Sequence, residues 1–202
     1  RHLIISKIRN YLIDRNFIEV ETPVLASQVG GAAAKPFITH HNAMKQDMFM
    51  RIAPELYLKQ LVIGGLDKVF EIGKNFRNES IDTTHNPEFT ACEFYMAGAD
   101  YYKLIDMTQE LLVNMVDSII GSMQLQWMGE TIDFTPPFKQ LDMMDTLQQE
   151  VRSLINDPKF ILPDIDSDTA TEEYINLHTL LNIKPEPPFT LNRLVDNLVG
   201  EL

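Results

Sequence analysis

The sequence predicts an α+β fold in which an antiparallel sheet is flanked by helices. Segments with strand-like composition occur in hairpin-like pairs, such as residues 69–76 and 89–96. Segments whose apolar residues recur at helical spacing lie between and after these pairs. The chain lacks the regular strand–helix alternation that builds a parallel sheet. Together these three observations favour an antiparallel sheet with helices packed against it.

The bulk composition limits the class of protein. The 202 residues are 45% hydrophobic, which is enough to bury one good core. The formal net charge of -12 argues against the generic basic surface of a nucleic-acid-binding domain. Cys92 is the sole cysteine, so neither an intrachain disulfide nor a cysteine-based zinc site can form. No run of 18 apolar residues occurs, and we therefore expect no membrane-spanning segment and no membrane partner.

The N-terminal part is expected to alternate helices with short extended segments. These are a helix over 2–15, an extended segment over 18–23, strands over 37–39 and 48–52, and a helix from Pro54 to about 63. Asn16 is a suitable residue to end the first helix. Because proline has no N–H to donate, the extended segment must end at Pro23 or lie at a sheet edge there.

The following part is expected to hold the longest strands and the longest helix. Strands over 69–76 and 89–96 are joined by a polar loop, and Asp100 is a good N-cap for a helix that runs to Gly121. A hairpin is predicted over 124–134, with a type II′ turn at Gly129-Glu130. The remaining helices are expected over 141–155, 171–181 and 190–202.

Polar side chains on the two long strands are the first candidates for a functional site. Side chains two residues apart share a face of a strand, so Glu93 and Tyr95 lie together. Arg77 and Glu79 would do so if the first strand continued that far. Such groups are costly to bury unless they pair or meet a ligand. Spacing alone leaves two interpretations open, a ligand site and a salt-bridged hairpin with solvated ends, and slightly favours the hairpin.

Four motifs, which follow one another in the order found in a known family, then point to that family. Residues 76–79 read Phe-Arg-Asn-Glu, residues 84–90 read Thr-His-Asn-Pro-Glu-Phe-Thr, and residues 93–95 read Glu-Phe-Tyr. Together they resemble motif 2 of the class II aminoacyl-tRNA synthetases, in the form typical of the lysyl-tRNA synthetases. Residues 17–25 resemble motif 1, which forms the dimer interface in this class. Residues 30–37 and 51–59 are similar to lysyl enzymes as well, and four motifs in order are far more specific than a lone Arg-x-Glu.

The resemblance implies an ATP site on the loop that follows residue 76. Arg77 is expected to be the catalytic residue, because a planar guanidinium can bridge the lysine carboxylate and the α-phosphate, two anions that repel. By resemblance, Glu79 lies near the adenine amino group, His85 lies by the phosphates, Asn86 belongs to the same site, and Phe89 stacks on the adenine. His85 taken alone would be an ordinary loop residue.

The resemblance also implies a pocket for lysine, a cation that requires anionic partners. Its expected members are Glu55, Glu93, the Tyr95 hydroxyl, the backbone near Gly31, and Arg77. The sequence leaves open which carboxylate meets the α-amino group and which meets the ε-amino group. Glu55 taken alone would serve the dipole at the start of its helix.

The whole protein is expected to be a cytoplasmic lysine–tRNA ligase that uses ATP and magnesium. Its expected partners are lysine, tRNA(Lys) and a second copy of itself, bound through the motif 1 region. Residues 1–202 contain nothing that resembles motif 3, the magnesium ligands of the family or its anticodon-binding barrel. We therefore expect a partial catalytic domain with no metal site within this span, cut from a longer protein and inactive on its own.

Two other readings stay open at this point. One is a paralogue that transfers lysine to a protein, and the other is a non-catalytic interaction module with a synthetase-like fold. A local departure from the family is Ser80, which stands where glycine is expected after the Arg-x-Glu. If that glycine required a positive φ, the serine would displace the start of the motif 2 loop.

Overall fold

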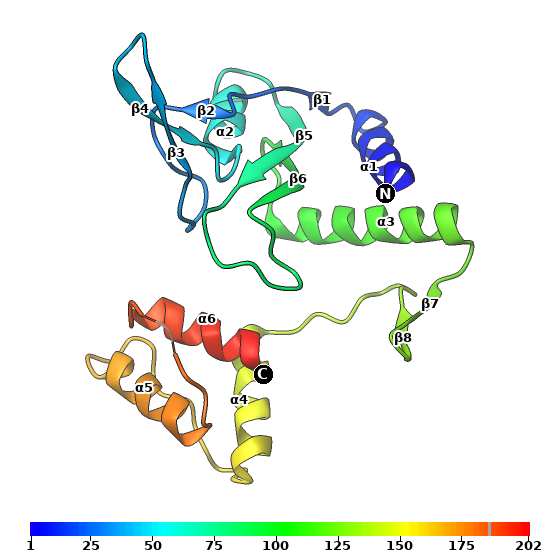
Figure 1. The fold of residues 1–202 in the computed structure, drawn as a ribbon. Helices are drawn as coiled ribbons and strands as arrows, with labels where there is room; N and C mark the ends of the chain where they lie inside the picture. The colour runs from blue at the N-terminus through cyan, green and yellow to red at the C-terminus, as the bar shows by residue number, and fades with distance from the viewer. Residues whose placement is uncertain (186) are drawn as a thin grey trace. The chain divides into compact units, whose positions relative to one another are not determined.

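The computed structural model describes residues 1–185 and 187–202. The described residues form two compact units, Arg1–Phe138 and Lys139–Leu202 (Figure 1). That all 202 residues belong to one catalytic domain stays a prediction.

The first unit follows the predicted order of elements and adds one short strand that was not predicted, β2. Its elements are α1 (His2–Ile13), β1 (Ile18–Glu19), β2 (Leu25–Ala26), β3 (Ile38–His41), β4 (Gln46–Met50), α2 (Glu55–Ile63), β5 (Lys68–Phe76), β6 (Glu88–Met96), α3 (Tyr101–Ile120), β7 (Gln124–Trp127) and β8 (Glu130–Asp133). The extended segment predicted over 18–23 is a strand only at its beginning. Pro23 lies between β1 and β2, outside both strands, so its missing N–H removes no hydrogen bond from a sheet.

The central sheet has the strand order β1-β5-β6, and a second sheet has the order β2-β4-β3. Strands β5 and β6 are antiparallel, with Lys68 opposite Met96 and Phe76 opposite Glu88. The predicted antiparallel arrangement is confirmed for this pair and for the second sheet. The short strand β1 instead runs parallel to β5, because the chain between them crosses over through β2–β4 and α2.

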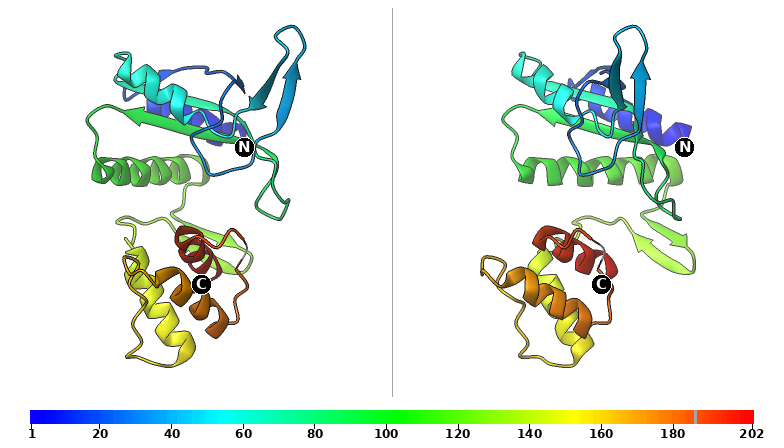
Figure 2. Two further views of the ribbon diagram at one scale, coloured as in Figure 1. Left: turned by 90° about the vertical axis from the view of Figure 1, so that its left-hand side faces the viewer. Right: turned by 60° about the vertical axis from the view of Figure 1, so that its left-hand side comes forward.

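Helices α1 and α3 cover one face of the central sheet. The core on this side is formed by Tyr11, Leu12, Phe17, Phe70 and Met107. Phe17 meets Phe94 of β6 edge to face, with ring centroids 5.7 Å apart. Both views in Figure 2 show α3 running alongside β6. Because side chains alternate along a strand, the residues between the core positions point to the other face.

The predicted N-cap at Asp100 is confirmed, whereas α1 ends at Ile13 with Asp14 as its C-cap, two residues before Asn16. Asn16 adopts a left-handed φ of 63°, which turns the chain after α1. The Asp100 side chain accepts a hydrogen bond from the backbone N–H of Lys103 at 2.9 Å. It thereby satisfies one of the free donors in the first turn of α3. Gly121 ends α3 in the left-handed region, at φ 75°.

The β7–β8 hairpin has the predicted position but a different turn. Trp127 pairs with Glu130, so the two loop residues are Met128 and Gly129. Both have positive φ, 50° and 93°, which defines a type I′ turn and not the predicted type II′ turn at Gly129-Glu130. The prediction was wrong by one residue because it assigned the first loop position to glycine. The right-handed strand twist favours type I′ even with a methionine in that place.

The second unit contains α4 (Met143–Ile155), α5 (Ala170–Leu180) and α6 (Leu191–Glu201), close to the predicted ranges. Its core is formed by Leu147, Val151, Tyr174, Leu177, Leu194, Val195 and Leu198. Asp142 caps α4 by accepting the Asp145 N–H at 2.9 Å. Within residues 1–185 and 187–202, no helix has the length and apolar content needed to cross a membrane.

Candidate active site

The face of β5 and β6 that points away from α1 and α3 carries acidic and hydroxyl groups. Glu93 and Tyr95 lie together on this face, and the Tyr95 hydroxyl donates to Glu93 Oε2 at 3.3 Å. Helix α2 packs against both strands. Its first residue is Glu55, whose Oε1 accepts from Lys59 Nζ at 2.6 Å. The same Lys59 nitrogen lies 5.9 Å from the centre of the Tyr95 ring.

Glu93 lies in a partly buried, net acidic environment, in which Arg51 is the nearby cation that favours its ionised form. Burial raises the pKa of Glu93 above the ordinary carboxyl value, and the nearby Glu55 raises it further. Burial and the Glu93 carboxylate likewise raise the pKa of the Tyr95 hydroxyl. A cation bound here would stabilise the ionised form of Glu93, so the arrangement suits a positively charged ligand.

Gly31 brings backbone to this pocket from a distant loop. Its φ is 87°, a conformation that side chains other than glycine rarely adopt. A Cβ placed on it would lie 2.9 Å from the Glu55 Cβ and 3.3 Å from the Ala53 Cβ. Glycine therefore allows the loop backbone to lie directly against the start of α2.

A cavity of about 200 Å³ lies at the end of the two long strands. It is lined by Arg77, Glu79, Ser80, Thr84, His85, Asn86 and Phe89. Strand β5 ends at Phe76, so the strand alternation expected to align Arg77 with Glu79 does not apply. The two side chains line one cavity because the loop turns there.

The Arg77 guanidinium lies over the Phe89 ring, with its carbon 5.0 Å from the ring centre. Its Nε is buried and has no hydrogen-bond partner among the described residues. An unsatisfied buried donor is costly and is found where a ligand supplies the acceptor. Arg77 therefore has an N–H free for an anion, on a side chain that Phe89 keeps in place.

Backbone hydrogen bonds join the loop after β5 to the segment after Gly31. The Asn78 N–H donates to the Lys35 carbonyl at 2.7 Å, and the Lys35 N–H donates to Glu79 Oε1 at 3.3 Å. The Arg77 N–H donates to the Pro87 carbonyl at 2.9 Å. Ser80 is not among the residues with positive φ, so a serine fits the backbone where glycine was expected.

His85 is held by a turn within the same loop. Its Nδ1 lies 2.8 Å from Asp82 Oδ2, while Asp82 Oδ1 accepts the backbone N–H groups of Thr84 and His85 at 2.7 and 2.8 Å. These backbone hydrogen bonds lower the pKa of Asp82 to about 2. Asp82 therefore stays ionised and fixes one ring nitrogen of His85, which leaves Nε2 for a ligand.

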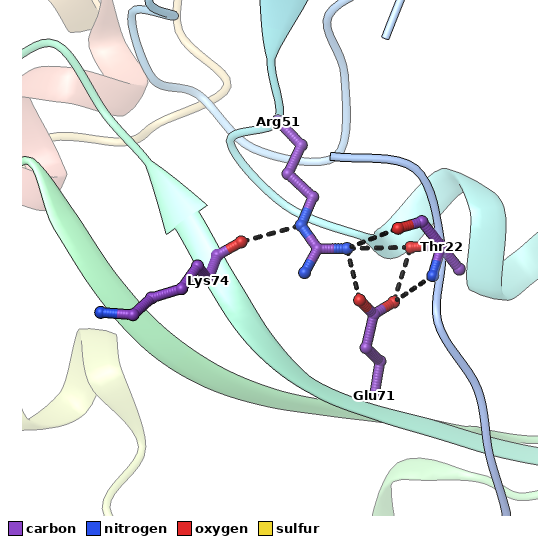
Figure 3. A network of polar contacts seen from close by, with 4 residues as sticks. All are labelled: Thr22, Arg51, Glu71 and Lys74. Carbon is purple, nitrogen blue, oxygen red and sulfur yellow. Dashed lines mark hydrogen bonds and ion pairs between the residues drawn. The ribbon is translucent and has the colours of Figure 1, made fainter. Parts of the chain in front are cut away.

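A buried ion pair that the sequence analysis did not single out lies on the pocket face of β5 (Figure 3). Arg51 Nη1 donates to Glu71 Oε1 at 2.5 Å, and both side chains are less than one-tenth exposed. The sequence could have indicated this pair, because Arg51 and Glu71 are charged residues within apolar stretches, where a buried charge requires a partner.

Comparison with known proteins identifies the class. The family described as tRNA synthetases class II (D, K and N) matches residues 1–185, so the chain belongs to this family of class II aminoacyl-tRNA synthetases. Within it, the resemblance to the lysyl-tRNA synthetases is confirmed by the relatives. The chain is 47% identical over 211 residues to the probable cytoplasmic lysine–tRNA ligase of Enterocytozoon bieneusi, a match that covers 100% of this chain and 40% of the relative.

Other relatives agree with this assignment. Lysine–tRNA ligase cla4 of Cladosporium cladosporioides is 45% identical, over 100% of this chain and 34% of its own length. A lysine–tRNA ligase of Clostridium botulinum is 52% identical over 149 residues, which are 74% of this chain and 30% of the relative. The chain thus spans well under half the length of these curated relatives.

Proposed function

We propose that the complete protein is an ATP-dependent lysine–tRNA ligase that acts in the cytoplasm. The observation that carries the proposal is that two groups of candidate site residues share one face of strand β6, with Glu93 and Tyr95 in one group and Phe89 in the other. One half is the acidic cluster of Glu55, Glu93 and Tyr95, and the other is the cavity of Arg77 and Phe89. The names of the relatives support lysine–tRNA ligation over protein lysylation or a non-catalytic role.

The acidic half is proposed to bind lysine. Glu55 and Glu93 supply negative charge, Tyr95 supplies a hydroxyl, and the backbone at Gly31 borders the pocket. The raised pKa of Glu93 supports this role, because a substrate ammonium group would remove the cause of the shift. Aspartate would place a third carboxylate beside these two, and asparagine would leave them without a counter-charge.

The second half is proposed to bind ATP and to join it to lysine. The lysine carboxylate is ionised at neutral pH, so it can attack the α-phosphorus without a general base, and pyrophosphate leaves. Arg77 is proposed to span both anions with its planar donors. Phe89 provides an aromatic face for adenine, Glu79 a carboxylate for its amino group, and His85 a ring nitrogen near the phosphates. Asn86 lines the same cavity.

Magnesium is proposed to be bound by parts of the protein outside this span. Across residues 1–185 and 187–202, no group of three or more His, Cys, Asp or Glu could hold a metal ion. No step of the proposed reaction is therefore assigned to a metal-bound residue of this chain. The net charge of -12 likewise supports tRNA(Lys) contacts made mostly by other parts of the protein.

A homodimer through the motif 1 region is also proposed. Apolar side chains are exposed along α1 and the following segment, including Leu3, Ile18 and Leu25, each between 47% and 49% exposed. An apolar groove lies beside them, lined by Arg1, Ile4, Ile5, Ile8, Ile72, Thr90, Ala91 and Cys92. An apolar surface of this kind is typical of a self-complementary twofold contact.

Aminoacylation by the complete protein tests the proposed function. We expect tRNA charging with lysine in preference to aspartate and asparagine. Glu93→Gln should raise the KM for lysine, whereas Glu88→Gln, an exposed carboxylate on the same strand that pairs with Lys74, should leave it unchanged. Preferential charging of aspartate or asparagine, or equal effects of the two substitutions, would refute the proposal.

A further inference from the structure

The buried Arg51–Glu71 pair ties together three segments that are distant in the sequence (Figure 3). Arg51 Nε donates to the Lys74 carbonyl at 2.8 Å, and Nη1 donates to the Thr22 hydroxyl oxygen at 3.0 Å. Glu71 Oε2 accepts from the Thr22 hydroxyl at 2.6 Å and from the Thr22 N–H at 3.2 Å. Both oxygens of Glu71 therefore have donors within the network.

Gly73 leaves room for the Arg51 guanidinium on this face of β5. A Cβ on Gly73 would collide with Arg51 Nη2 and would lie 3.1 Å from Glu71 Oε1. Glycine at this strand position lets the guanidinium lie directly on the β5 backbone, although glycine weakens a strand. The guanidinium thus occupies a defined position above β5.

Glu71 and Glu93 are direct cross-strand partners in the β5–β6 ladder. Two like charges at opposite positions destabilise a sheet and compete for any cation that binds between them. The groups around Glu93 are Tyr95 on its own strand, Glu71 on β5, Glu55 on α2, and Arg51. Arg51 is the cation among them, and it forms its ion pair with Glu71.

We propose that Arg51 is a positioning residue for the lysine pocket. By neutralising Glu71 and turning it toward Thr22, Arg51 leaves Glu93 as the carboxylate of this cross-strand pair that can bind a substrate ammonium group. The inference rests on the proposed function, since it specifies how the same pocket selects its cation. Glu71 and Arg51 touch neither substrate in this account.

Two consequences distinguish this role from simple stabilisation. Without Arg51, the Glu71 carboxylate is unpaired beside Glu93 and competes with it for the lysine ammonium group. Without Glu71, the Arg51 guanidinium is free to pair with Glu93 and competes with lysine itself. Removing both charges eliminates both competitors, and burying a neutral pair of similar volume is often tolerated.

The test is ATP–pyrophosphate exchange by the complete protein with three variants, Arg51→Met, Glu71→Gln and the double variant. Each single variant should raise the KM for lysine about tenfold, because one uncompensated charge shifts binding by the equivalent of about one pKa unit. The KM for ATP should change by less than about twofold, since the ATP half of the site is untouched. The double variant should return the lysine KM to within about threefold of the unmodified protein.

Matched controls separate the charge effect from folding. Lys74→Met removes an exposed cation from the same strand and should leave both KM values unchanged. Arg51→Lys retains a cation beside Glu71 but loses the planar fork, so its lysine KM should lie between those of the unmodified protein and Arg51→Met. If Arg51→Met does not fold, Glu71→Gln and the double variant carry the test.

The outcomes can be told apart. A lysine KM that stays high in the double variant, or equal rises in the KM values for lysine and ATP, would overturn the positioning role. An unchanged lysine KM in the single variants would overturn it as well. Absence of lysine-dependent exchange in the unmodified protein would instead overturn the proposed function.

Discussion

Replacing Arg77 by alanine in the complete protein should abolish adenylate formation and leave the fold intact. The side chain lies over Phe89, with its guanidinium carbon 5.0 Å from the ring centre, and its buried Nε has no partner among the described residues. The stacking contributes about 0.5–1 kcal/mol at a partly exposed site. The unsatisfied donor costs about 1–3 kcal/mol. These terms oppose each other, so truncation should not lower the free energy of unfolding.

The effect on the reaction should be much larger. A preorganised donor aimed at developing charge contributes about 3 kcal/mol, so its loss lowers the rate by a factor of at least about one hundred. Arg77→Lys should recover little of this rate, because an ammonium group is a point charge and cannot span two anions as a planar fork does. The loss should fall mainly on kcat for the exchange reaction, since Arg77 is proposed to act on the transition state.

ATP–pyrophosphate exchange measures the rate, and thermal unfolding of the same samples measures the fold. Lys74→Ala is the matched control, because Lys74 is an exposed cation near the end of β5, just before Arg77, and pairs with Glu88 at 2.7 Å. It should retain the exchange rate. An Arg77→Ala variant that exchanges pyrophosphate at close to the unmodified rate would refute the assigned role. A large fall in its melting temperature would refute the energetic argument.

Three further predictions concern single residues. Burial and Glu55 raise the pKa of Glu93, so its contribution to stability is present at low pH and is lost as pH rises through the folded pKa. Glu93→Gln should therefore raise the melting temperature at neutral pH but not at a pH below 4.5, the ordinary pKa of the carboxyl group. Equal changes in melting temperature at the two pH values would contradict this. Burial raises the pKa of the Cys92 thiol to about 11, so iodoacetamide should alkylate it far more slowly in the folded protein than in urea; equal rates would contradict its burial. Asp100→Ala removes the cap on Lys103 and should cost about 1 kcal/mol in urea unfolding, and an unchanged midpoint would count against the cap.

The site was predictable to the extent that a motif fixes both residue type and local geometry. The resemblance to motif 2 indicated Arg77, His85 and Phe89 as members of one site, and all three line one cavity. The sequence indicated Glu93 and Tyr95 as neighbours on one strand face, and the Tyr95 hydroxyl donates to Glu93. Their roles in binding remain predictions. Such neighbours can be predicted from the sequence because strand alternation and loop closure depend on only a few consecutive residues.

Local chemistry also determined the order of the elements and most of their ends. The turn at Asn16 and the helix start at Asp100 follow from the backbone preferences and side-chain hydrogen bonds of those residues, which operate within one turn of a helix. The hairpin at 124–134 was predicted for the same reason. Its turn type was not, because the twist of the paired strands decided between turns that the residues Met128 and Gly129 alone left open.

Tertiary structure alone decided the contacts between distant segments. The parallel pairing of β1 with β5 depends on where an intervening crossover of about fifty residues returns the chain, which no local pattern encodes. The same holds for Arg51, Glu71 and Thr22, which meet only after three segments have packed together. In the sequence they are three unrelated polar residues. They become one buried network because a charge removed from water must find its partner wherever the fold places it.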